Sequence, residues 1–489
     1  MSSITSSCLI TPSEPTPNGI LRFSQMDLMV PLHHIPSFLY FYKPNHHNNI
    51  TPSSYALIEK MKESLGRILV HYYPLAGRLR SIEGDQLVLE CNAMGVEFLE
   101  AESNAKVSDY TEFAEPNKIF KDLATQFDYC STPVEQWPLL LVKVTKFSCG
   151  GLCLCVAFSH IMVDGWALFP FIKSWAKLGR GEDLEEDEIP FHDRSIWKTL
   201  IPPFDHELNP QRCIDGQIAD HSGFKAPPLL LGCSDSKEEQ KKETTFEVLK
   251  ITREQIEKLK EEANQKQTLP SAFDAFGRPY SRYEVVAAHM WRCACMARNG
   301  DKNQPTAIRI VADLRKRLKI DHLKCYFGNA VIPVLTPTCL YGDILSNPLS
   351  FSAQKIREAT VMLTDEYLRS TLNHAENNMD AKKVHALSYE SKNGYFYGNP
   401  NLSIGSLIGL PIYDGDFGWG KPAFMSLGTL GAHDGKSMIV PSPDDDIVIS
   451  PTRESSTFCR IFRLSLTVED LYFSFFCLFL FLFFTSVCM

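Results

Sequence analysis

The fold is indicated most clearly by residues 138–178, which read PLLLVKVTKFSCGGLCLCVAFSHIMVDGWALFPFIKSWAKL. Two β-type runs, 138–147 and 151–160, are joined by a short turn, which predicts a hairpin. Residues 165–178 then place large apolar side chains three or four positions apart, the spacing of a buried helix. His160 therefore falls at the end of the second strand, in the connection to the helix. Rigid scaffolds often present reactive groups at such positions.

On the N-terminal side of this stretch, residues 55–70 have one apolar stripe at helical spacing, and 86–92 predict a strand. On the C-terminal side, acidic and proline-rich residues favour a linker over 181–242. A helix is then expected from Thr252, with Gln255 completing a capping box. Another helix is expected over 282–297, followed by mixed strands and loops.

The chain has 489 residues, which favours two domains over one. We expect an α/β fold with an N-terminal domain over 1–180, the linker at 181–242, a C-terminal domain over 243–450 and an atypical tail over 451–489.

Composition excludes several classes of protein. Hydrophobic residues make up 44% and charged residues 22%, which excludes wholesale disorder and a multi-span membrane protein. The net charge is −9, and no segment combines basic with aromatic residues, so we expect no nucleic-acid partner. The 15 cysteines lack zinc-knuckle spacing, so we expect reduced thiols and no metal.

The two termini differ in character. The first 19 residues lack a basic region and a continuous apolar region, so we expect no secretory signal and a cytoplasmic protein. Residues 471–489 contain no charged side chain. They fit either a short membrane anchor or translated noncoding sequence, because U-rich codons encode Phe, Leu, Ser, Cys and Val. We favour the second interpretation.

His160, Asp164 and Gly165 form an H-x-x-x-D-G string between the predicted strand and helix. An imidazole held at a strand end can take a proton near neutral pH, so His160 is a candidate general base. The alternative is a core histidine that bonds to backbone.

A second string, Asp416 to Gly420, reads DFGWG. Gly418 and Gly420 permit backbone conformations closed to other residues, and Phe417 and Trp419 can anchor a tight loop by burial. A purely structural turn and a functional loop cannot be distinguished for this string, because a stiff loop can support a site without taking part in the reaction.

A third group combines D-L-R-K-R at 313–317 with YFGN at 326–329. Arginines here suit an ion pair with Asp164 or a phosphate, and solvated surface charge is the alternative. Phosphate-binding glycine loops and the G-x-S-x-G string are absent, so nucleotide hydrolysis, hydride transfer and serine-hydrolase chemistry lack their usual signals.

Together these strings resemble the BAHD family of plant acyl-CoA-dependent acyltransferases, whose two marks are HxxxDG and DFGWG. YYPLAGRLR at 72–80, Asp313-x-Arg315-x-Arg317 and YFGN add to the resemblance, which covers residues 15–450. It implies two chloramphenicol-acetyltransferase-like domains with a channel between them. It also implies acyl-CoA as co-substrate, without a permanently bound cofactor. We expect a monomer.

The resemblance also implies roles for the site residues. His160 deprotonates the acceptor amine or hydroxyl, which attacks the thioester directly without an acyl-enzyme. Asp164 points away from the substrate and pairs with an arginine, for which we choose Arg315. Residues 416–420 are structural in such proteins, although Asp416 is sometimes given a proton-accepting role. The residues that contact CoA are not indicated.

Within the family, several stretches look like spermidine hydroxycinnamoyl transferases and their shikimate-using relatives. Shikimate-using members have an arginine before the PNL string and a Thr-x-Trp after it, whereas this chain has Lys392, Gly405 and Leu407. We therefore favour transfer of a hydroxycinnamoyl group to spermidine, with shikimate or quinate as the alternative acceptor. A third hypothesis is an inactive, tail-anchored binding protein.

The end of the chain departs from the family pattern. Members close with a strand and a helix, whereas here Pro451 is expected to end the strand that begins at Ile447. A missing strand and helix would leave part of the second domain unpacked, because each large buried side chain contributes about 1.5–3 kcal/mol.

Overall fold

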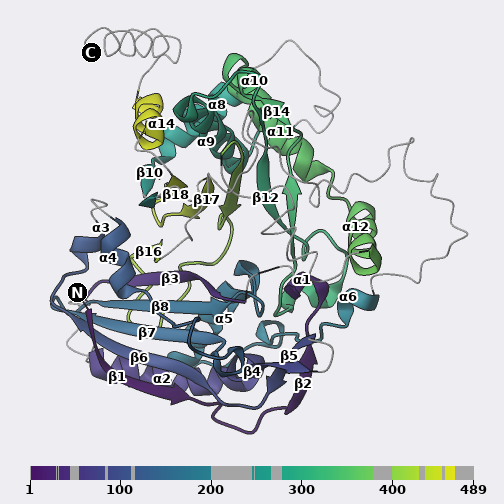
Figure 1. The fold of residues 1–489 in the computed structure, drawn as a ribbon. Coiled ribbons are helices and arrows are strands. Elements are labelled where there is room, and N and C mark those ends of the chain that lie inside the picture. The colour runs from purple at the N-terminus through teal and green to yellow at the C-terminus, as the bar shows by residue number, and fades with distance from the viewer. Residues whose placement is uncertain are drawn as a thin grey trace, which may run out of the picture.

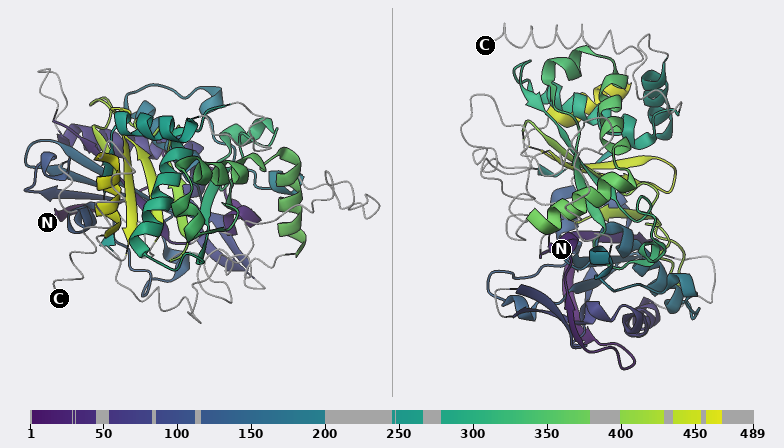
Figure 2. Two further views of the ribbon diagram at one scale, coloured as in Figure 1. Left: turned by 90° about the horizontal axis from the view of Figure 1, so that it is seen from above. Right: turned by 90° about the vertical axis from the view of Figure 1, so that its right-hand side faces the viewer.

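The computed structural model describes residues 2–28, 30, 32–44, 54–82, 86–111, 116–199, 245–246, 248–265, 278–378, 399–428, 435–453 and 457–467. These residues form two lobes, each built on a sheet (Figure 1). The side view in Figure 2 shows the green and yellow C-terminal lobe above the purple and blue N-terminal lobe.

The N-terminal lobe is built on a six-stranded sheet. Its strands, in spatial order, are β1 (Ser2–Ile10), β6 (Val96–Ser103), β7 (Leu140–Phe147), β8 (Leu152–Ser159), β3 (His34–Tyr42) and β16 (Phe424–Leu427). A smaller sheet contains β2 (Gly19–Arg22), β5 (Gln86–Cys91) and β4 (Arg78–Ile82). The helices of this lobe are α2 (Ser54–His71), α3 (Ser108–Thr111), α4 (Pro116–Leu123) and α5 (Gly165–Gly179), with 3₁₀ turns at Tyr73–Ala76, Val134–Gln136 and Glu186–Glu188. The short helices α1 (Gln25–Leu28) and α6 (Ile196–Thr199) come from the same half of the chain, but Met26, Ile196 and Trp197 are buried in the core of the C-terminal lobe.

The C-terminal lobe is built on a second sheet. Its path is β10 (Leu249–Ile251), β18 (Ile447–Arg453), β17 (Lys436–Pro441), β15 (Leu402–Ser406), β12 (Ile308–Asp313) and β13 (Val331–Leu335), and β9 (Thr245–Phe246) pairs with β18. β11 (Pro305–Thr306) pairs with β14 (Cys339–Leu340). The helices are α8 (Arg253–Asn264), α9 (Arg282–Arg298), α10 (Tyr341–Ser346), α11 (Leu349–Val361), α12 (Asp365–Asn378) and α14 (Thr457–Thr467), with a 3₁₀ turn at Asp321–Cys325.

The predicted hairpin is confirmed, because β7 and β8 pair antiparallel. Every residue of β8 is buried, including Cys153 and Cys155, since the sheet is covered on both faces. The predicted helix after it is α5, whose apolar stripe is buried. The expected capping box at Thr252 is also present at the start of α8.

One expectation about the C-terminal lobe is wrong. The part after residue 298 was expected to contain strands and loops, yet it contains α10, α11 and α12. In α11, Leu349, Ala353 and Ile356 are buried at helical spacing. The apolar periodicity that predicts a helix was therefore present in the sequence. The three helices pack on the same core as α9.

The second half of the chain also contributes to the first lobe. β16 pairs antiparallel with β3, with Phe424 opposite Phe41, so the N-terminal sheet contains a strand from the region 243–450. Sequence reasoning divided the two domains at one linker and did not anticipate this exchange. The part of the predicted linker beyond residue 199 lies outside the described residues.

The expected break at Pro451 does not occur. β18 continues to Arg453, with Pro451 opposite Ser437, because a proline removes only its own N–H from the ladder. α14 follows and buries Phe458, Cys459, Ile461 and Phe462 in the C-terminal core. The strand and helix that the family pattern requires are therefore both present, whereas the apolar segment 471–489 lies outside the described residues.

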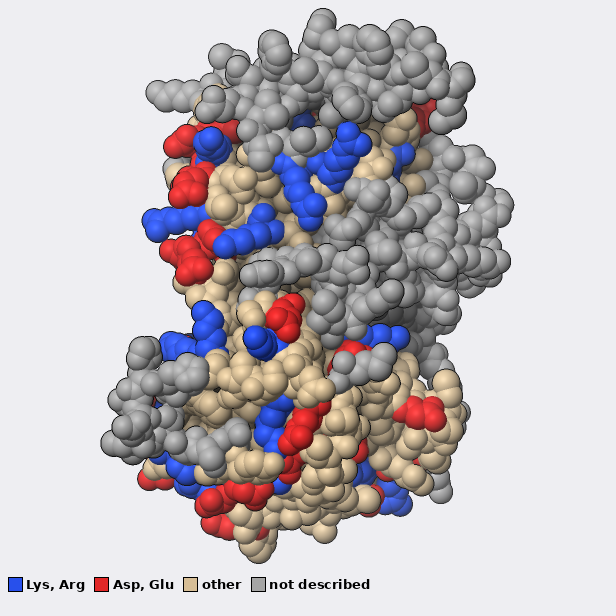
Figure 3. Space-filling view, turned by 90° about the vertical axis from the view of Figure 1, so that its left-hand side faces the viewer, with Lys and Arg blue, Asp and Glu red and all other residues tan. Residues whose placement is uncertain are grey.

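Among the described residues, no helix combines the length and the apolar character needed to cross a membrane. The described cysteines are all free, and no cluster of His, Cys, Asp and Glu within those ranges has the make-up of a metal site. On the face drawn in Figure 3, Lys and Arg side chains intermingle with Asp and Glu.

Candidate active site

The candidate base lies where the two lobes meet. The backbone N–H of His160 donates to the carbonyl of His33, which precedes β3, at 3.1 Å. The side chain is half-buried: Nδ1 is shielded from solvent and has no hydrogen-bond partner, but the ring is not sealed off as a whole. Lys436 on β17 and Asn329 before β13, both from the C-terminal lobe, act on the imidazole.

Burial is the main influence on the protonation of His160, and it lowers the pKa of the imidazole below its ordinary value. The ammonium of Lys436 lowers the pKa further, whereas the backbone carbonyl of His160, the carboxylate of Asp164 and the side chain of Asn329 raise it. The net shift is downward. The ring is therefore neutral at neutral pH, which is the form that accepts a proton.

Asp164 joins the turn to the other lobe. Its side chain caps α5 by accepting from Ala167 N at 3.1 Å. Its Oδ2 accepts from Arg315 Nη1 at 2.9 Å and from Ala330 N at 2.8 Å. Both partners of the expected Asp164–Arg315 ion pair are buried. These hydrogen bonds join the turn to the start of α5, to Arg315 and to the backbone before β13.

Arg315 is itself held on several sides. It donates to Asp313 Oδ1 at 3.0 Å and to the carbonyls of Tyr326 and Gly328 at 3.2 and 2.9 Å. A Cβ on Gly165, the first residue of α5, would meet only ordinary contacts, so packing does not require glycine there.

Two further side chains hold the backbone of the turn. Asn329 Nδ2 donates to the carbonyls of His160 and Ile161 at 2.9 and 3.1 Å. Arg194 Nη2 donates to the carbonyl of Met162 at 3.3 Å. Three consecutive carbonyls of the turn therefore have side-chain donors from outside the N-terminal sheet.

Asp27 in α1 connects these two donors. Its Oδ1 accepts from the backbone N and the Nδ2 of Asn329 at 3.0 and 3.1 Å. Its Oδ2 accepts from Arg194 Nε at 3.2 Å and from the N and Oγ of Ser24 at 3.0 and 2.7 Å. Asp27 is fully buried, so this charge depends on its partners.

Sequence reasoning missed Asp27 and Arg194 and quoted Asn329 only as part of YFGN. Ser24-x-x-Asp27 has the spacing of a local side-chain cap, which is a weak signal for Asp27. Arg194 has no sequence signal, because its partners lie far away along the chain.

The DFGWG loop lies at the other end of α5. Phe417 is buried, with its ring centroid 4.9 Å from that of Trp175 near the end of the helix. Arg180, which follows α5, donates to the carbonyl of Asp416. A helix of 15 residues is about 22 Å long, so this loop and His160 are separated by roughly that distance.

The loop is closed by its own carboxylate. Asp416 Oδ1 accepts from Gly418 N at 2.8 Å and from Gly420 N at 2.9 Å. Both glycines have positive φ, 93° and 98°, which a residue with a Cβ adopts only with strain. Trp419 packs against the N-terminal core. The geometry favours the structural role for Asp416 over the proton-accepting one.

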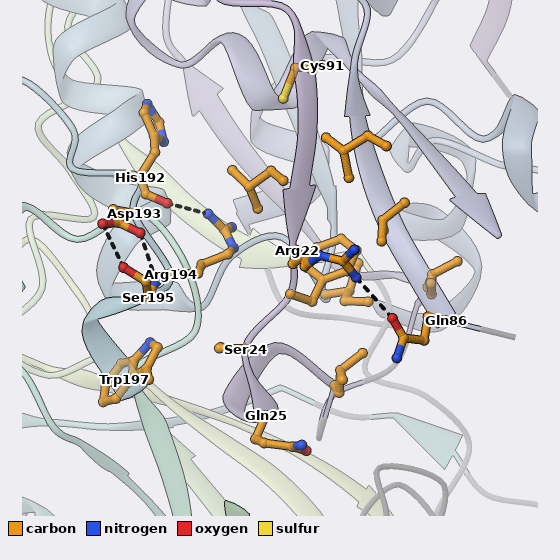
Figure 4. Close-up of a pocket in the computed structure, with 18 of the residues that line it drawn as sticks. Arg22, Ser24, Gln25, Gln86, Cys91, His192, Asp193, Arg194, Ser195 and Trp197 are labelled. Carbon is orange, nitrogen blue, oxygen red and sulfur yellow. Dashed lines mark hydrogen bonds between the residues drawn. The ribbon is translucent and has the colours of Figure 1, made fainter. Parts of the chain in front are cut away.

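A cavity of about 1120 Å³ adjoins the turn that follows His160, at Ile161 (Figure 4). Its wall runs from β2 and β5, where Arg22 donates to Gln86, to the segment that contains His192 and Arg194. Ile161 lines this cavity but His160 does not. A channel that passes the imidazole therefore stays a prediction.

Comparison with known proteins places the chain in a family. Residues 2–451 match the Transferase family. The hydroxycinnamoyl-CoA:piscidic acid hydroxycinnamoyltransferase of Actaea racemosa is 42% identical over 454 residues, which cover 92% of this chain and 96% of that protein. The chain belongs to the BAHD acyltransferase family. It is an acyl-CoA-dependent acyltransferase, with acyl-CoA as co-substrate.

Other relatives of this BAHD protein support the same placement. The shikimate O-hydroxycinnamoyltransferase of Nicotiana tabacum is 36% identical, with 90% of this chain and 93% of that protein covered. The crystal structure of vinorine synthase superposes with a TM-score of 0.66 at 21% identity, and covers 96% of this chain and 99% of that one. This likeness supports the fold of two chloramphenicol-acetyltransferase-like domains.

Proposed function

We propose that this BAHD protein transfers a hydroxycinnamoyl group from CoA to an acceptor, with His160 as general base. The donor is inferred from relatives that are hydroxycinnamoyltransferases. The observation that carries the role of His160 is a neutral, half-buried imidazole at the end of β8. Its turn is fixed by side chains from the C-terminal lobe and from the segment after α5.

In the proposed step, His160 Nε2 takes the proton from the acceptor hydroxyl or amine as the acceptor attacks the thioester carbonyl. The tetrahedral intermediate then collapses, the C–S bond breaks, and the CoA thiolate leaves and receives a proton from the imidazolium. No acyl-enzyme forms. General-base assistance of this kind contributes about 10²- to 10⁴-fold to the rate.

For the acceptor, we infer a molecule with a carboxylate. The ammonium of Lys436 on β17 lowers the pKa of His160, so the proposed reaction centre experiences a positive charge from the C-terminal lobe. This charge repels a polyamine and attracts a carboxylate. Piscidic acid, shikimate and 5-hydroxyanthranilate, named for the relatives, all carry a carboxylate.

Spermidine is the second candidate acceptor. It is favoured by Gly405 and Leu407, which stand where shikimate-using members have Thr-x-Trp. Lys392, which is the nearest cation to the position of the arginine in shikimate-using members, lies outside the described residues. The two acceptors differ in charge, so a direct assay separates them.

The base is tested with His160→Gln, and with His322→Ala on the surface of the C-terminal lobe as the matched control. We expect His160→Gln to lower kcat with p-coumaroyl-CoA by about 10²- to 10⁴-fold at an unchanged melting temperature, and the control to keep its activity. Near-normal turnover by His160→Gln would remove His160 from the mechanism.

The acceptor is tested by pairing p-coumaroyl-CoA with piscidic acid, shikimate, 5-hydroxyanthranilate and spermidine in turn. We expect product with a carboxylate acceptor, and a higher KM for that acceptor in Lys436→Gln at an unchanged KM for the thioester. Turnover of spermidine alone, improved in Lys436→Gln, would favour the polyamine.

We also propose that the protein acts as a cytoplasmic monomer. Gel filtration with light scattering tests the oligomeric state. Fractionation of cells that express the full chain tests the location, because an anchored tail places the protein in the membrane pellet.

A further inference from the structure

The cavity of about 1120 Å³ shown in Figure 4 has no part in the proposed reaction. Its wall contains Ile161 and Arg194 but neither His160 nor Lys436. Arg194 connects the wall to the turn, because its Nη2 donates to the carbonyl of Met162 at 3.3 Å. The cavity therefore adjoins the turn at 160–162 without containing the proposed base.

The size and the apolar lining of the cavity suit a small organic molecule. Pockets that bind such molecules usually measure about 300–1,000 Å³ and have mostly apolar walls. Here the aliphatic part of the wall includes Leu21 on β2, Val88 on β5 and Ile161 in the turn, and Tyr73 and Trp197 add aromatic rings. An aromatic ligand suits this wall, because aromatic pairs gain attraction beyond the area that they bury.

The charged side chains of the wall favour an anionic ligand. Three of them are cations, Arg22, Arg194 and Lys198, and one is an anion, Asp193. The carboxylate of Asp193 is occupied within its own turn, since Oδ1 accepts from the N and Oδ2 from the Oγ of Ser195, both at 2.8 Å. A cavity that is lined mainly by one sign of charge attracts ligands of the opposite sign.

Arg22 is the cation best placed to hold a carboxylate. Its side chain on β2 is exposed, and Nη1 donates to the neutral amide of Gln86 at 3.0 Å. Arg194, by contrast, is buried and paired with Asp27 at 3.2 Å. Figure 4 shows Arg22 and Gln86 on the opposite side of the cavity from Arg194 and Trp197. Because a guanidinium can bind both oxygens of a carboxylate at once, Arg22 supplies the anion site.

Two side chains of the wall hold an acceptor without a hydrogen-bond partner. They are Gln25, through Oε1, and His192, through Nδ1, and both atoms are buried. His192 Nε2 lies 2.7 Å from the carbonyl of His71, which can only accept, so Nε2 carries the proton and Nδ1 does not. Buried polar atoms rarely remain unpaired. A ligand hydroxyl can donate to either acceptor once the side chain turns toward the cavity.

We propose that this cavity is a second ligand site, which binds a hydroxylated aromatic carboxylate. The carboxylate pairs with Arg22, the ring packs against Tyr73 and Trp197, and a hydroxyl donates to Gln25 or His192. The site goes beyond the transfer reaction and does not depend on the role of His160. A free hydroxycinnamate and its ester with a hydroxy acid share this chemistry.

The first test is calorimetric titration of the full chain with p-coumaroyl-CoA at saturation and no acceptor. The thioester then fills the active site and has nothing to acylate, so a ligand that still binds does so elsewhere. p-Coumarate and p-coumaroylshikimate are titrated in separate arms, and the arm with the lower Kd identifies the source. We expect one molecule to bind per chain. Binding that disappears when the thioester is present would overturn the proposal.

The second test compares Arg22→Ala with Arg80→Ala, an exposed arginine of β4 in the same small sheet that is bonded to Glu90. We expect Arg22→Ala to raise the Kd by about 10-fold, the low end for a hydrogen bond to a charged group, because Arg22 is exposed to solvent. Gln25→Leu should raise the Kd by about 3- to 10-fold. The control should keep the wild-type Kd, and all three variants the wild-type melting temperature.

Three results would contradict the second site. They are an unchanged Kd in folded Arg22→Ala, an equal loss in Arg80→Ala, and binding of spermidine in place of the two acids. If p-coumaroyl-CoA itself does not bind, the proposed function has failed instead. The effect of Arg22→Ala on the Kd of the acids then still decides whether the cavity is a site.

Discussion

The backbone of His160 is held by hydrogen bonds, and the pKa of its imidazole is shifted by burial and by the charges of Asp164 and Lys436. Asp164 is not its hydrogen-bond partner, because the carboxylate accepts instead from Ala167 N in α5, from Arg315 and from Ala330 N. The two motif residues of HxxxD therefore have separate tasks. One is proposed to react, and the other holds the turn between the lobes.

The ion pair makes a prediction at the residue scale. Asp164→Ala should lower the free energy of unfolding by about 3 kcal/mol, the low end for breaking a buried pair, because Asp313 still balances Arg315. Asp164→Asn keeps a side-chain oxygen that can accept from Arg315 and from Ala330 N, so it should lose less stability and less activity than Asp164→Ala. Urea unfolding and kcat measure the two effects.

An Asp164→Asn variant no more stable than Asp164→Ala would contradict this account. It would mean that the hydrogen bonds which the Asp164 side chain accepts from Arg315 and Ala330 N are not the source of the stability.

At the scale of elements, α5 separates the two family motifs. Its first turn is capped by Asp164, and its last turn contacts the DFGWG loop. The loop therefore stabilises the far end of the helix that begins at the candidate site. Sequence order alone does not indicate this arrangement, because the loop is more than 200 residues further along the chain.

This separation predicts different outcomes for two neighbouring residues. Asp416→Asn should keep kcat, because an amide oxygen can still accept from Gly418 and Gly420. Phe417→Ala should lower stability by about 3–5 kcal/mol through loss of a buried ring, with unchanged kcat per folded molecule. Thermal unfolding and active-enzyme assays measure both.

If Asp416→Asn loses activity at an unchanged melting temperature, the proton-accepting role is supported and the structural one is insufficient.

Across the whole molecule, two buried histidines, His34 and His289, and the partly buried His192 make stability depend on pH. Burial lowers the pKa of His34 to about 4, that of His192 to about 4 and that of His289 to about 3. In the unfolded chain each titrates near 6.5. Below that pH the unfolded state binds protons that the folded state does not, so stability falls with falling pH.

The contribution of each neutral histidine to the free energy of unfolding is fully present above pH 6.5. It is lost as the pH falls from 6.5 to about 4 for His34 and His192, and to about 3 for His289. In this range the free energy of unfolding should fall by about 1.4 kcal/mol per pH unit for each histidine. Urea unfolding between pH 7 and 4 measures it. His34→Gln, which can still contact Tyr129 and the carbonyl of Pro138, should reduce the slope by one such share. A slope equal to wild type in that variant would contradict the assignment.

Local sequence patterns indicated the hairpin, the helices at 54–71, 165–179, 253–264 and 282–298, and the strings that contain His160, Asp164, Arg315 and Asn329. Local periodicity and capping carry that information, because each depends on neighbours a few positions apart. The α/β class followed from the same patterns.

Which distant residues meet is seen only in the folded protein. It brought Asp27, Arg194 and Asn329 to the turn at 160–162, placed β16 in the N-terminal sheet, and set the DFGWG loop at the far end of α5. Each of these contacts joins segments separated by long stretches of chain. Such pairings are selected by burial and by the need to satisfy buried polar groups. Neither requirement produces a regular spacing of residues along the sequence.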